Sequence, residues 1–348
     1  MLIRFLISIF FCSAACIVHA KSNIVWEGRF RGEEISNLSG GVKDGTVLNG
    51  DLRLIGTYAD TFSLGVIAAT HTRSQNEYTD SLQNTTSINT QREIRIGRLA
   101  YKHDFNKTLC VYIGITDMED WFNITPAANW LVNSAFSNSE ALNLTTQLAS
   151  FPYPGFGAML QYQQDNTYGL FGIYQGNPQY QKTVFTRGYM LIGEAGTTLL
   201  LDDKVLKNLF LQLGVWVYEP ESIPGYVDAQ GFYLTAQTDW QYRTHPMQAF
   251  AQFAYSHESP SYIPYSIILG ANAQNIFCKD KREWLSFGIG KIWIHNFPSE
   301  VVYELCYIYR FAQNYYFTAD LQYITKPSGI HPNATVCLFR FSYMLGKS

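Results

Sequence analysis

The sequence predicts an all-β chain whose strands close into a transmembrane antiparallel β-barrel. Three observations lead to this fold class: an exported type of N-terminus, repeated segments of alternating hydrophobicity, and few charges among many aromatic residues. Charged residues make up 15% of the 348 positions, against about 25% in soluble globular proteins. Aromatic residues make up 16% and apolar residues 47%, which argues against a disordered chain. The formal net charge of −3 argues against a nucleic-acid partner.

The N-terminal segment MLIRFLISIFFCSAACIVHA has the features of a secretory signal peptide. Arg4 supplies the positive charge, an apolar core follows, and Val18 and Ala20 place small residues at a cleavage site. We expect cleavage near Ala20, which removes residues 1–20 and leaves 21–348 as a single outer-membrane β-barrel domain. A membrane anchor is the alternative, but the apolar run is short for a helical span.

After this segment, no run approaches the roughly 18 consecutive apolar residues of a transmembrane helix. Segments of about ten residues instead alternate apolar and polar positions, which is the period of β-strands. Phe317 and Leu321, for example, share one face of their segment, while Thr318 and Asp320 share the other. The expected strands are 24–31, 47–58, 62–72, 91–104, 107–116, 155–163, 167–175, 183–196, 208–219, 226–240, 247–256, 262–272, 283–294, 299–310, 315–325 and 334–345.

Closure of these strands into a barrel follows from the lipid environment. Lipid cannot hydrogen-bond backbone N–H and C=O groups, so membrane-spanning strands must pair around a closed ring. The count of about 16 strands is even, as in bacterial outer-membrane barrels. A soluble sandwich or propeller is the alternative, but its outer faces need more charge than this chain carries. Aromatic residues near strand ends are expected to form two interfacial girdles: Tyr58, Tyr101, Trp216, Tyr218, Trp240, Trp284, Trp293 and Tyr343.

Residues 117–154 break the strand pattern. A loop of this length in a compact domain usually serves the function of the protein. We expect it to fold into the barrel and to narrow the lumen, with residues 133–148 partly helical. An ordinary surface loop is the alternative.

Four stretches carry a recognisable order of short motifs. They read IGITD and WFN at 113–117 and 121–123, LVNSAF at 131–136, FPYPGFGA and GIYQGNP at 151–158 and 172–178, and ELCYIY and ADLQYITKPSG at 304–309 and 319–329. In this order they resemble the carbohydrate-selective porin (OprB) family of bacterial outer membranes. The chain departs from the family pattern at Leu131, where the family has Phe, and at Ser328, which is inserted before Gly329.

The resemblance implies a sixteen-stranded barrel in the bacterial outer membrane that passes sugars by diffusion. It implies polar, charged and aromatic residues on the inward loops and in the lumen. The implied partners are small sugars or similar polar solutes, outer-membrane lipid and the barrel-assembly machinery. No cofactor and no nucleic acid is expected, and a homo-oligomer is left open.

The chemistry of a sugar suggests which residues would line such a lumen. Its hydroxyls need polar or charged partners, and its C–H faces suit aromatic rings. The candidates for pore lining or substrate contact are Asp51, Arg53, Glu93, Arg95, Trp121, Phe122, Trp130, Glu304, Arg310, Asp320 and Arg340. Opposed arginines and carboxylates would create a transverse field that orients a dipolar solute. The alternative is structural, with the charged pairs bracing the wall and the aromatic residues anchoring the long loop.

Enzyme signatures and metal motifs are missing from the sequence. It contains no Gly-x-Ser-x-Gly elbow and no His-Glu-x-x-His helix motif, so we do not expect an enzyme. Cys110, Cys278, Cys306 and Cys337 remain after signal cleavage, with wide spacings that match no metal motif. Two disulfides and four isolated small side chains are both compatible with the sequence.

The sequence therefore predicts an outer-membrane porin for passive diffusion of small carbohydrates and similar polar solutes into the periplasm. The lumen is expected to be constricted, charged and lined with aromatic residues. Three alternatives remain: a general porin without sugar preference, a structural or adhesive barrel with a plugged pore, and a barrel hydrolase.

Overall fold

The computed structural model describes residues 23–88, 92–179, 185, 187–201, 206–221, 225, 227–258, 262–277 and 282–346. The predicted signal peptide lies outside these ranges.

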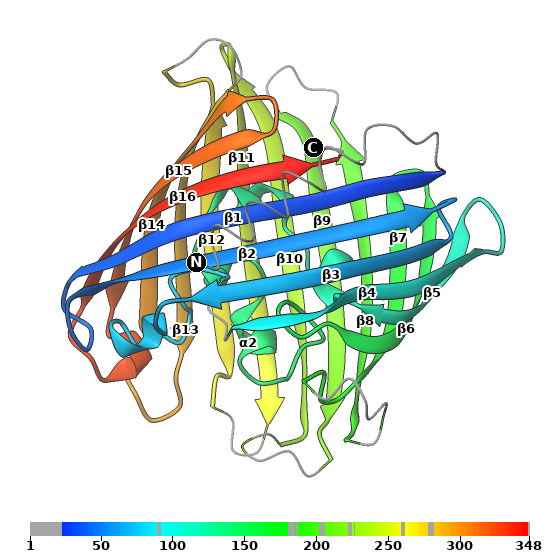
Figure 1. Cartoon of the computed structure of the whole chain (residues 1–348), viewed down its shortest axis with the longest axis horizontal. Helices are drawn as coiled ribbons and strands as arrows, with labels where there is room; N and C mark the ends of the chain where they lie inside the picture. The colour runs from blue at the N-terminus through cyan, green and yellow to red at the C-terminus, as the bar shows by residue number, and fades with distance from the viewer. Residues whose placement is uncertain are drawn as a thin grey trace.

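Within the described residues, sixteen strands form one closed antiparallel barrel, which confirms the predicted fold class (Figure 1). Each strand pairs with its neighbours in chain order, and β1 pairs with β16 to close the ring. The first strand is longer than the expected 24–31. The strands are β1 (Ile24–Ser39), β2 (Gly45–Tyr58), β3 (Phe62–His71), β4 (Glu93–Asp104), β5 (Leu109–Thr116), β6 (Gly155–Gln164), β7 (Thr167–Gln175), β8 (Tyr189–Leu200), β9 (Leu206–Glu219), β10 (Ala229–Tyr242), β11 (His245–Glu258), β12 (Tyr265–Gln274), β13 (Glu283–Trp293), β14 (Glu300–Ala312), β15 (Tyr315–Thr325) and β16 (Ala334–Leu345).

The two ends of the barrel differ in their connections. Tight hairpins, such as those from Tyr242 to His245 and from Ala312 to Tyr315, lie at the same end as the start of β1 and the end of β16. The long connections 72–92 and 117–154 lie at the opposite end. We call these the turn end and the loop end. No described helix has the length and apolar character that a membrane-spanning helix needs.

Alternation along the strands separates an apolar outer surface from a polar interior. On β15, Phe317 and Leu321 face outward and are exposed, whereas Asp320 and Gln322 face inward and are buried. Only half of each strand therefore has to be apolar, which explains the ordinary overall hydrophobicity of the chain.

The predicted aromatic girdles are present, but three of their expected members are not in them. Tyr58 and Tyr101 are exposed on the outer surface. Trp216 and Tyr218 instead face inward and are 2% and 0% exposed. Trp284 also faces inward and stacks on Trp130 of the long loop. The prediction was wrong for these three residues, because aromatic side chains pack against an inward loop as well as against lipid.

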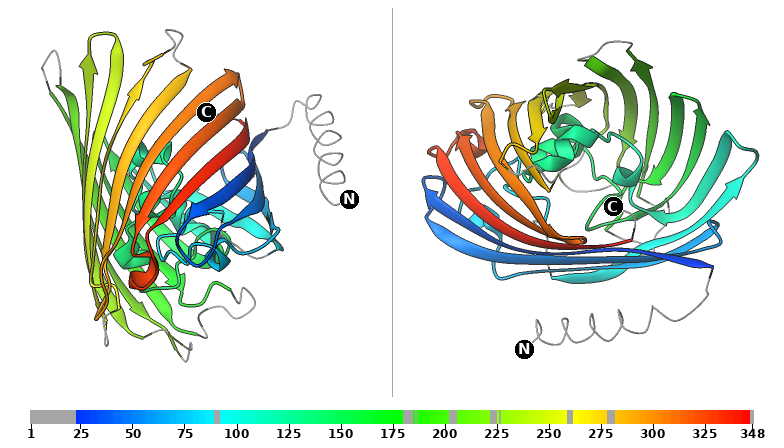
Figure 2. Two further views of the ribbon diagram at one scale, coloured as in Figure 1. Left: turned by 90° about the vertical axis from the view of Figure 1, so that its left-hand side faces the viewer. Right: turned by 90° about the horizontal axis from the view of Figure 1, so that it is seen from above.

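Two connections fold into the barrel rather than over its surface. The 117–154 loop enters between β5 and β6, and its helix lies inside the ring of strands (Figure 2). The predicted inward, partly helical loop is thereby confirmed. Residues 72–88, the described part of the connection after β3, also turn inward, which the sequence analysis did not anticipate. The short helices are η1 (Gln75–Glu77), η2 (Met118–Asp120), η3 (Pro126–Trp130), η4 (Ser134–Phe136), α2 (Glu140–Asn143) and η5 (Pro327–Gly329).

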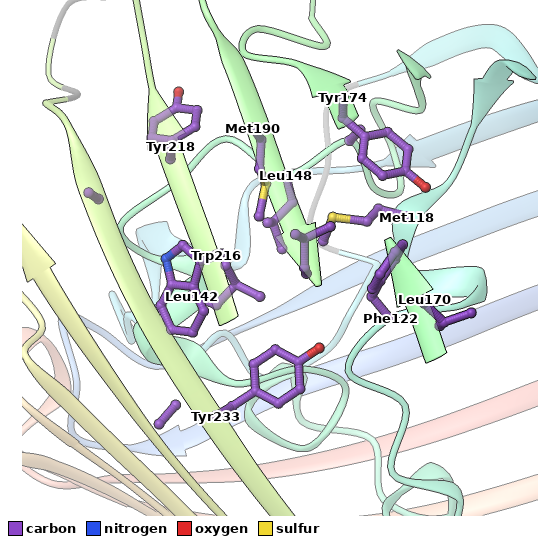
Figure 3. Close-up of a cluster of buried hydrophobic side chains, with 14 of the residues drawn as sticks. Met118, Phe122, Leu142, Leu148, Leu170, Tyr174, Met190, Trp216, Tyr218 and Tyr233 are labelled. Atoms are coloured by element: carbon purple, nitrogen blue, oxygen red, sulfur yellow. The ribbon is translucent and has the colours of Figure 1, made fainter. Parts of the chain in front are cut away.

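The long loop has a hydrophobic core of its own against one side of the wall. Met118 and Phe122 from the loop pack with inward-facing Trp216, Tyr218 and Tyr233 of β9 and β10 (Figure 3). Burial of this much aromatic surface favours a single position for the loop over a mobile one. The loop consequently occupies the β7–β13 side of the lumen and leaves the opposite side open.

Three of the four cysteines expected in the exported chain are described. The thiols of Cys110, Cys306 and Cys337 are free. Cys278 lies outside the described residues.

Candidate functional site

Buried glutamates on the barrel wall hold the backbone of the long loop. Glu304 of β14 accepts the backbone N–H groups of Val132 at 2.5 Å and Asn133 at 2.9 Å. Glu194 of β8 accepts the backbone N–H of Asn123 at 2.6 Å. A buried backbone donor without a partner costs roughly 1–3 kcal/mol, so these carboxylates are what permits a loop to lie inside the barrel.

The second inward loop is held in the same way. Glu300, at the start of β14, accepts the Ser81 hydroxyl at 2.7 Å and the backbone N–H groups of Leu82 at 3.1 Å and Gln83 at 3.0 Å. Gln322 then joins the two loops, because its side-chain amide donates to the Thr85 carbonyl while its oxygen accepts from Asn133. The two inward loops thus form one body fixed to the β13–β15 wall.

A cavity of about 1090 Å³ remains between this body and the strands on the opposite side. Its walls come from β1, β2, β4, β5, β14, β15 and β16 and from the two loops. This volume lies just above the usual range for small-molecule sites, roughly 300–1,000 Å³.

Arginines line the strand side of the cavity: Arg29, Arg31, Arg53, Arg98 and Arg340. Each is paired with a carboxylate. Arg31 forms a two-pronged contact with Asp51 at 2.6 and 3.1 Å, and Arg29 reaches the same carboxylate at 3.0 Å. Arg340 pairs with Glu33 at 2.8 Å and also donates to the Thr86 hydroxyl of the inward loop.

Two of these arginines pair directly with carboxylates of the long loop at the edge of the cavity. Arg53 contacts Asp120 at 2.6 Å and Asp117 at 3.8 Å. Arg98 pairs with Asp120 as well, and its guanidinium lies 5.2 Å from the Trp121 ring. The arginines lie on the strands and their carboxylate partners on the loop, whereas the carboxylates proposed from the sequence lie on strands.

A β-bulge brings Arg98 into this site. Gly65 of β3 pairs with Arg98 and the next residue, Val66, pairs with Ile96, so Gly97 is an extra residue on β4. The bulge shifts the alternation by one position. Arg98 therefore faces inward although strict alternation would place it outward with Ile96.

Two carboxylates of the long loop have raised pKa values. Burial, with a smaller contribution from neighbouring Asp120, raises the pKa of Asp117 to about 6. Burial and the nearby Asp117 raise the pKa of Glu119 to about 8. The negative charge on the loop consequently increases as the pH rises from about 6 to about 8.

Aromatic rings flank the charged residues. Trp121 packs against Tyr112 with ring centroids 5.3 Å apart. Trp130 stacks on Trp284 at 4.2 Å with an interplanar angle of 10°. Both loop tryptophans line the cavity.

The sequence candidates fall into three groups in the structure. Arg53, Trp121, Trp130 and Arg340 line the cavity. The residues of the second group are buried and contact neighbouring residues without lining the cavity: Asp51 under two arginines, Phe122 in the hydrophobic cluster, and Glu304 and Asp320 behind the loop. The last group lies away from the cavity lining: Glu93 and Arg95, which pair with each other near Tyr153, and Arg310 near the turn end of β14.

Sequence reasoning missed several lining residues for identifiable reasons. Arg29 and Arg31 alternate with outward residues of β1, but the expected strand ended at 31 and its phase was weak. Arg98 was hidden by the bulge, for which Gly97 was the available signal. Asp117, Glu119 and Asp120 lie on the loop, where no periodicity indicates direction.

One group of potential metal ligands exists among the described residues. Glu304, Cys306 and Asp320 place a ligand atom each within 4.8 Å of one another. Both oxygens of Glu304 already accept backbone N–H groups of the loop, so the geometry is accounted for by loop anchoring.

The sequence and the fold are both similar to those of known proteins. The family model for the carbohydrate-selective porin, OprB family, matches residues 66–275, which is more than half of the chain. The chain belongs to this family. A search of curated proteins found no match.

Solved structures agree with the fold. The high-pH structure of OprB from Pseudomonas putida matches with a TM-score of 0.81 and 15% identity, covering 93% of this chain and 94% of that one. The low-pH structure of the same porin matches with a TM-score of 0.62 at 15% identity and 93% coverage of both chains. A triple mutant of the Rhodopseudomonas blastica porin matches with a TM-score of 0.58 and 10% identity, covering 92% of this chain and 100% of that one. This OprB-family chain is therefore a barrel channel of the outer membrane, and family and fold point to a porin rather than an enzyme.

Removal of the Glu304 carboxylate should release the long loop. In Glu304→Ala, the buried N–H groups of Val132 and Asn133 lose their acceptor, at a cost of roughly 1–3 kcal/mol each. We expect hydrogen exchange of these two amides to accelerate by about tenfold or more. Glu34→Ala, which removes an outward-facing glutamate of β1, is the control and should leave exchange unchanged. Equal protection in Glu304→Ala and the parent would contradict the anchoring role.

The pKa values of the loop carboxylates predict a pH-dependent ion preference. As the pH rises from 5 through about 6 and about 8, Asp117 and then Glu119 lose protons, so the permeability ratio of cations to anions should increase. Glu119→Gln should remove the upper part of this rise. Reversal potentials in a salt gradient measure the ratio, with Glu34→Gln as the matched control. A flat ratio in the parent protein between pH 5 and 9 would refute the assignment.

Proposed function

We propose that the cavity between the loops and the strands is the constriction of a passive diffusion channel for small carbohydrates and similar polar solutes. The single observation that carries this proposal is the opposition of Arg53 and Arg98 to the loop carboxylates, beside tryptophan rings that line the same space. Guanidinium groups donate hydrogen bonds and carboxylates accept them, so both sides of the cavity match sugar hydroxyls.

The pairing of the charges suits a channel better than a tight binding site. Each lining arginine is already paired with a carboxylate, so a sugar exchanges with existing partners and gains little net energy. Trp121 and Trp130 offer flat surfaces for the C–H faces of a sugar ring. Weak contacts of this kind orient a solute without trapping it, and the concentration gradient then supplies the driving force.

The lengths of the connections between strands indicate the orientation of the barrel in the membrane. Outer-membrane barrels have short periplasmic turns and longer outer loops. We place the turn end, with the start of β1 and the end of β16, at the periplasm and the loop end outside. Residues 1–20 would serve as the export signal, cleaved near Ala20, and 21–348 would form one barrel domain inserted by the assembly machinery. Assembly of several barrels into a homo-oligomer is compatible with this placement.

Conductance in a planar bilayer tests the proposal. The purified full-length protein should give steady openings that mono- and disaccharides block in a saturable way. Openings indifferent to sugars would favour a general porin. A well-folded protein without openings would favour a structural barrel and overturn the channel assignment.

Arg53 is the residue whose change should alter the constriction most directly. In Arg53→Ala, the cavity widens and Asp120 loses its 2.6 Å partner, so ion conductance should increase. Saccharide block should weaken by about tenfold, the equivalent of one hydrogen bond to a charged group. Arg310→Ala, an inward arginine that does not line the cavity, is the matched control. Arg95, which pairs with Glu93 near Tyr153 at the loop end, also lies outside the lining, so Arg95→Ala should behave like this control. Identical currents and block in Arg53→Ala and Arg310→Ala would remove Arg53 from the constriction.

A further inference from the structure

The outer surface of the barrel has a hollow that the lumen does not explain. It has a volume of about 680 Å³ and lies on the β7–β12 strands, which are green to yellow in Figure 1. Its exposed surface is mostly apolar, although Thr167 and Thr197 also line it. Ala236 and Ala251 pair across β10 and β11, and their small side chains leave a depression among exposed Leu211, Leu213 and Leu234.

The hollow follows a row of residues that pair across neighbouring strands. The pairs run Ala195 to Leu213, Leu213 to Leu234, Leu234 to Phe253, and Phe253 to Ile267. Ile267 then pairs with Lys291 of β13. At about 4.8 Å between neighbouring strands, the row is about 24 Å long.

This row runs obliquely across the membrane-facing surface. Ala195 lies in the middle of β8, whereas Lys291 lies beside the last residues of β13 at the loop end. Strands of membrane barrels tilt by roughly 35–45°, so a lateral row of residues climbs from the apolar middle toward the interface. One end of the hollow is therefore deep in the membrane and the other is near the headgroups.

Lys291 is an unusual residue at this place. Among the described strand residues, Lys291 and Lys207 are the lysines and arginines on the outward face, and Lys291 is the one near the loop end. Its ammonium lies 4.3 Å from the Trp293 ring, which directs it toward the loop end. Trp293 in turn belongs to an aromatic ladder with Tyr265 and Tyr255, at centroid distances of 6.2 and 5.4 Å.

Among the described residues, the charge of Lys291 has no acidic partner. No carboxylate lies within ion-pair distance of its ammonium among the residues that the structure describes. A second cation, exposed Lys326, follows Thr325 of β15, which pairs with the same Val301 that pairs with Lys291. Two nearby cations at the interface, beside an apolar hollow, match a molecule with an anionic head and an acyl chain.

We propose that the hollow and Lys291 form one binding site for a phosphorylated glycolipid of the outer leaflet. An acyl chain lies along the Ala195 to Ile267 row, and a headgroup phosphate contacts the ammonium of Lys291 beside Trp293. This inference rests on the proposed orientation, in which the loop end faces outward, but not on the substrate of the lumen.

Native mass spectrometry of the full-length barrel in detergent tests the site with lipid A as the probe. Lys291→Gln removes the charge, and Ala251→Phe fills the hollow. Both should lower the retained fraction of lipid A by about tenfold. Lys207→Gln, at the turn end of β9, and Ala319→Phe, on the outer face of β15, are the matched controls and should retain lipid A as the parent does.

Several results would overturn the proposal. Equal retention by Lys291→Gln and the parent would do so, as would equal retention of lipid A from which the phosphates have been removed. Equal retention of phosphatidylglycerol would overturn the choice of a glycolipid. If the parent sediments as an oligomer that Ala251→Phe dissociates, a second copy of the chain covers the hollow instead.

Saccharide block separates this site from the lumen. Lys291→Gln and Ala251→Phe should keep the parental conductance and block, since both side chains face away from the cavity. These measurements also show that the variants are folded. If these two variants lose lipid retention but keep normal sugar block, the lipid site is supported independently of the lumen. If sugars do not block the parent protein, only the proposed function is contradicted.

Discussion

The need to satisfy buried backbone groups of the inward loops determines the interior of this porin. A peptide segment inside a barrel leaves donors that neither strand pairing nor bulk water satisfies. Glu194, Glu300 and Glu304 supply acceptors at fixed positions on the wall. Because these carboxylates belong to rigid strands, the loops take one position. The lumen is thereby reduced to the space lined by β1, β2, β4, β5 and β14 to β16.

The charge arrangement of the constriction follows from that position. Strands contribute the arginines, and the loop contributes Asp117, Glu119 and Asp120. Neither half has the geometry of a site alone. Several motifs that resemble the OprB family hold the loop rather than line the pore: Asn123 meets Glu194, Asn133 meets Glu304, and Gln322 joins the two loops. The same motifs also contribute Asp117 and Trp121 to the lining, whereas the lining arginines all lie outside them.

The distribution of aromatic residues has the same cause. Lipid and a folded loop both accept aromatic side chains, so a tryptophan on a strand carries no information about which side it faces. Trp293 faces lipid and lies under the ammonium of Lys291. Trp216 and Trp284 face inward and pack against the loop. The outer surface and the interior therefore use the same types of aromatic side chain, and only the strand phase decides which side each one faces.

The sequence by itself determined the barrel and its strands, because alternation with a period of two is a local property of each segment. It also determined that 117–154 is not a strand and that Arg53 and Arg340 face inward. Tertiary structure alone decided which inward residues meet. Arg98 enters the site through a bulge at Gly97, Glu304 is covered by the loop, and Trp121 and Phe122 have different roles although they are adjacent. These outcomes depend on contacts between residues far apart in the chain, and no local periodicity records such contacts.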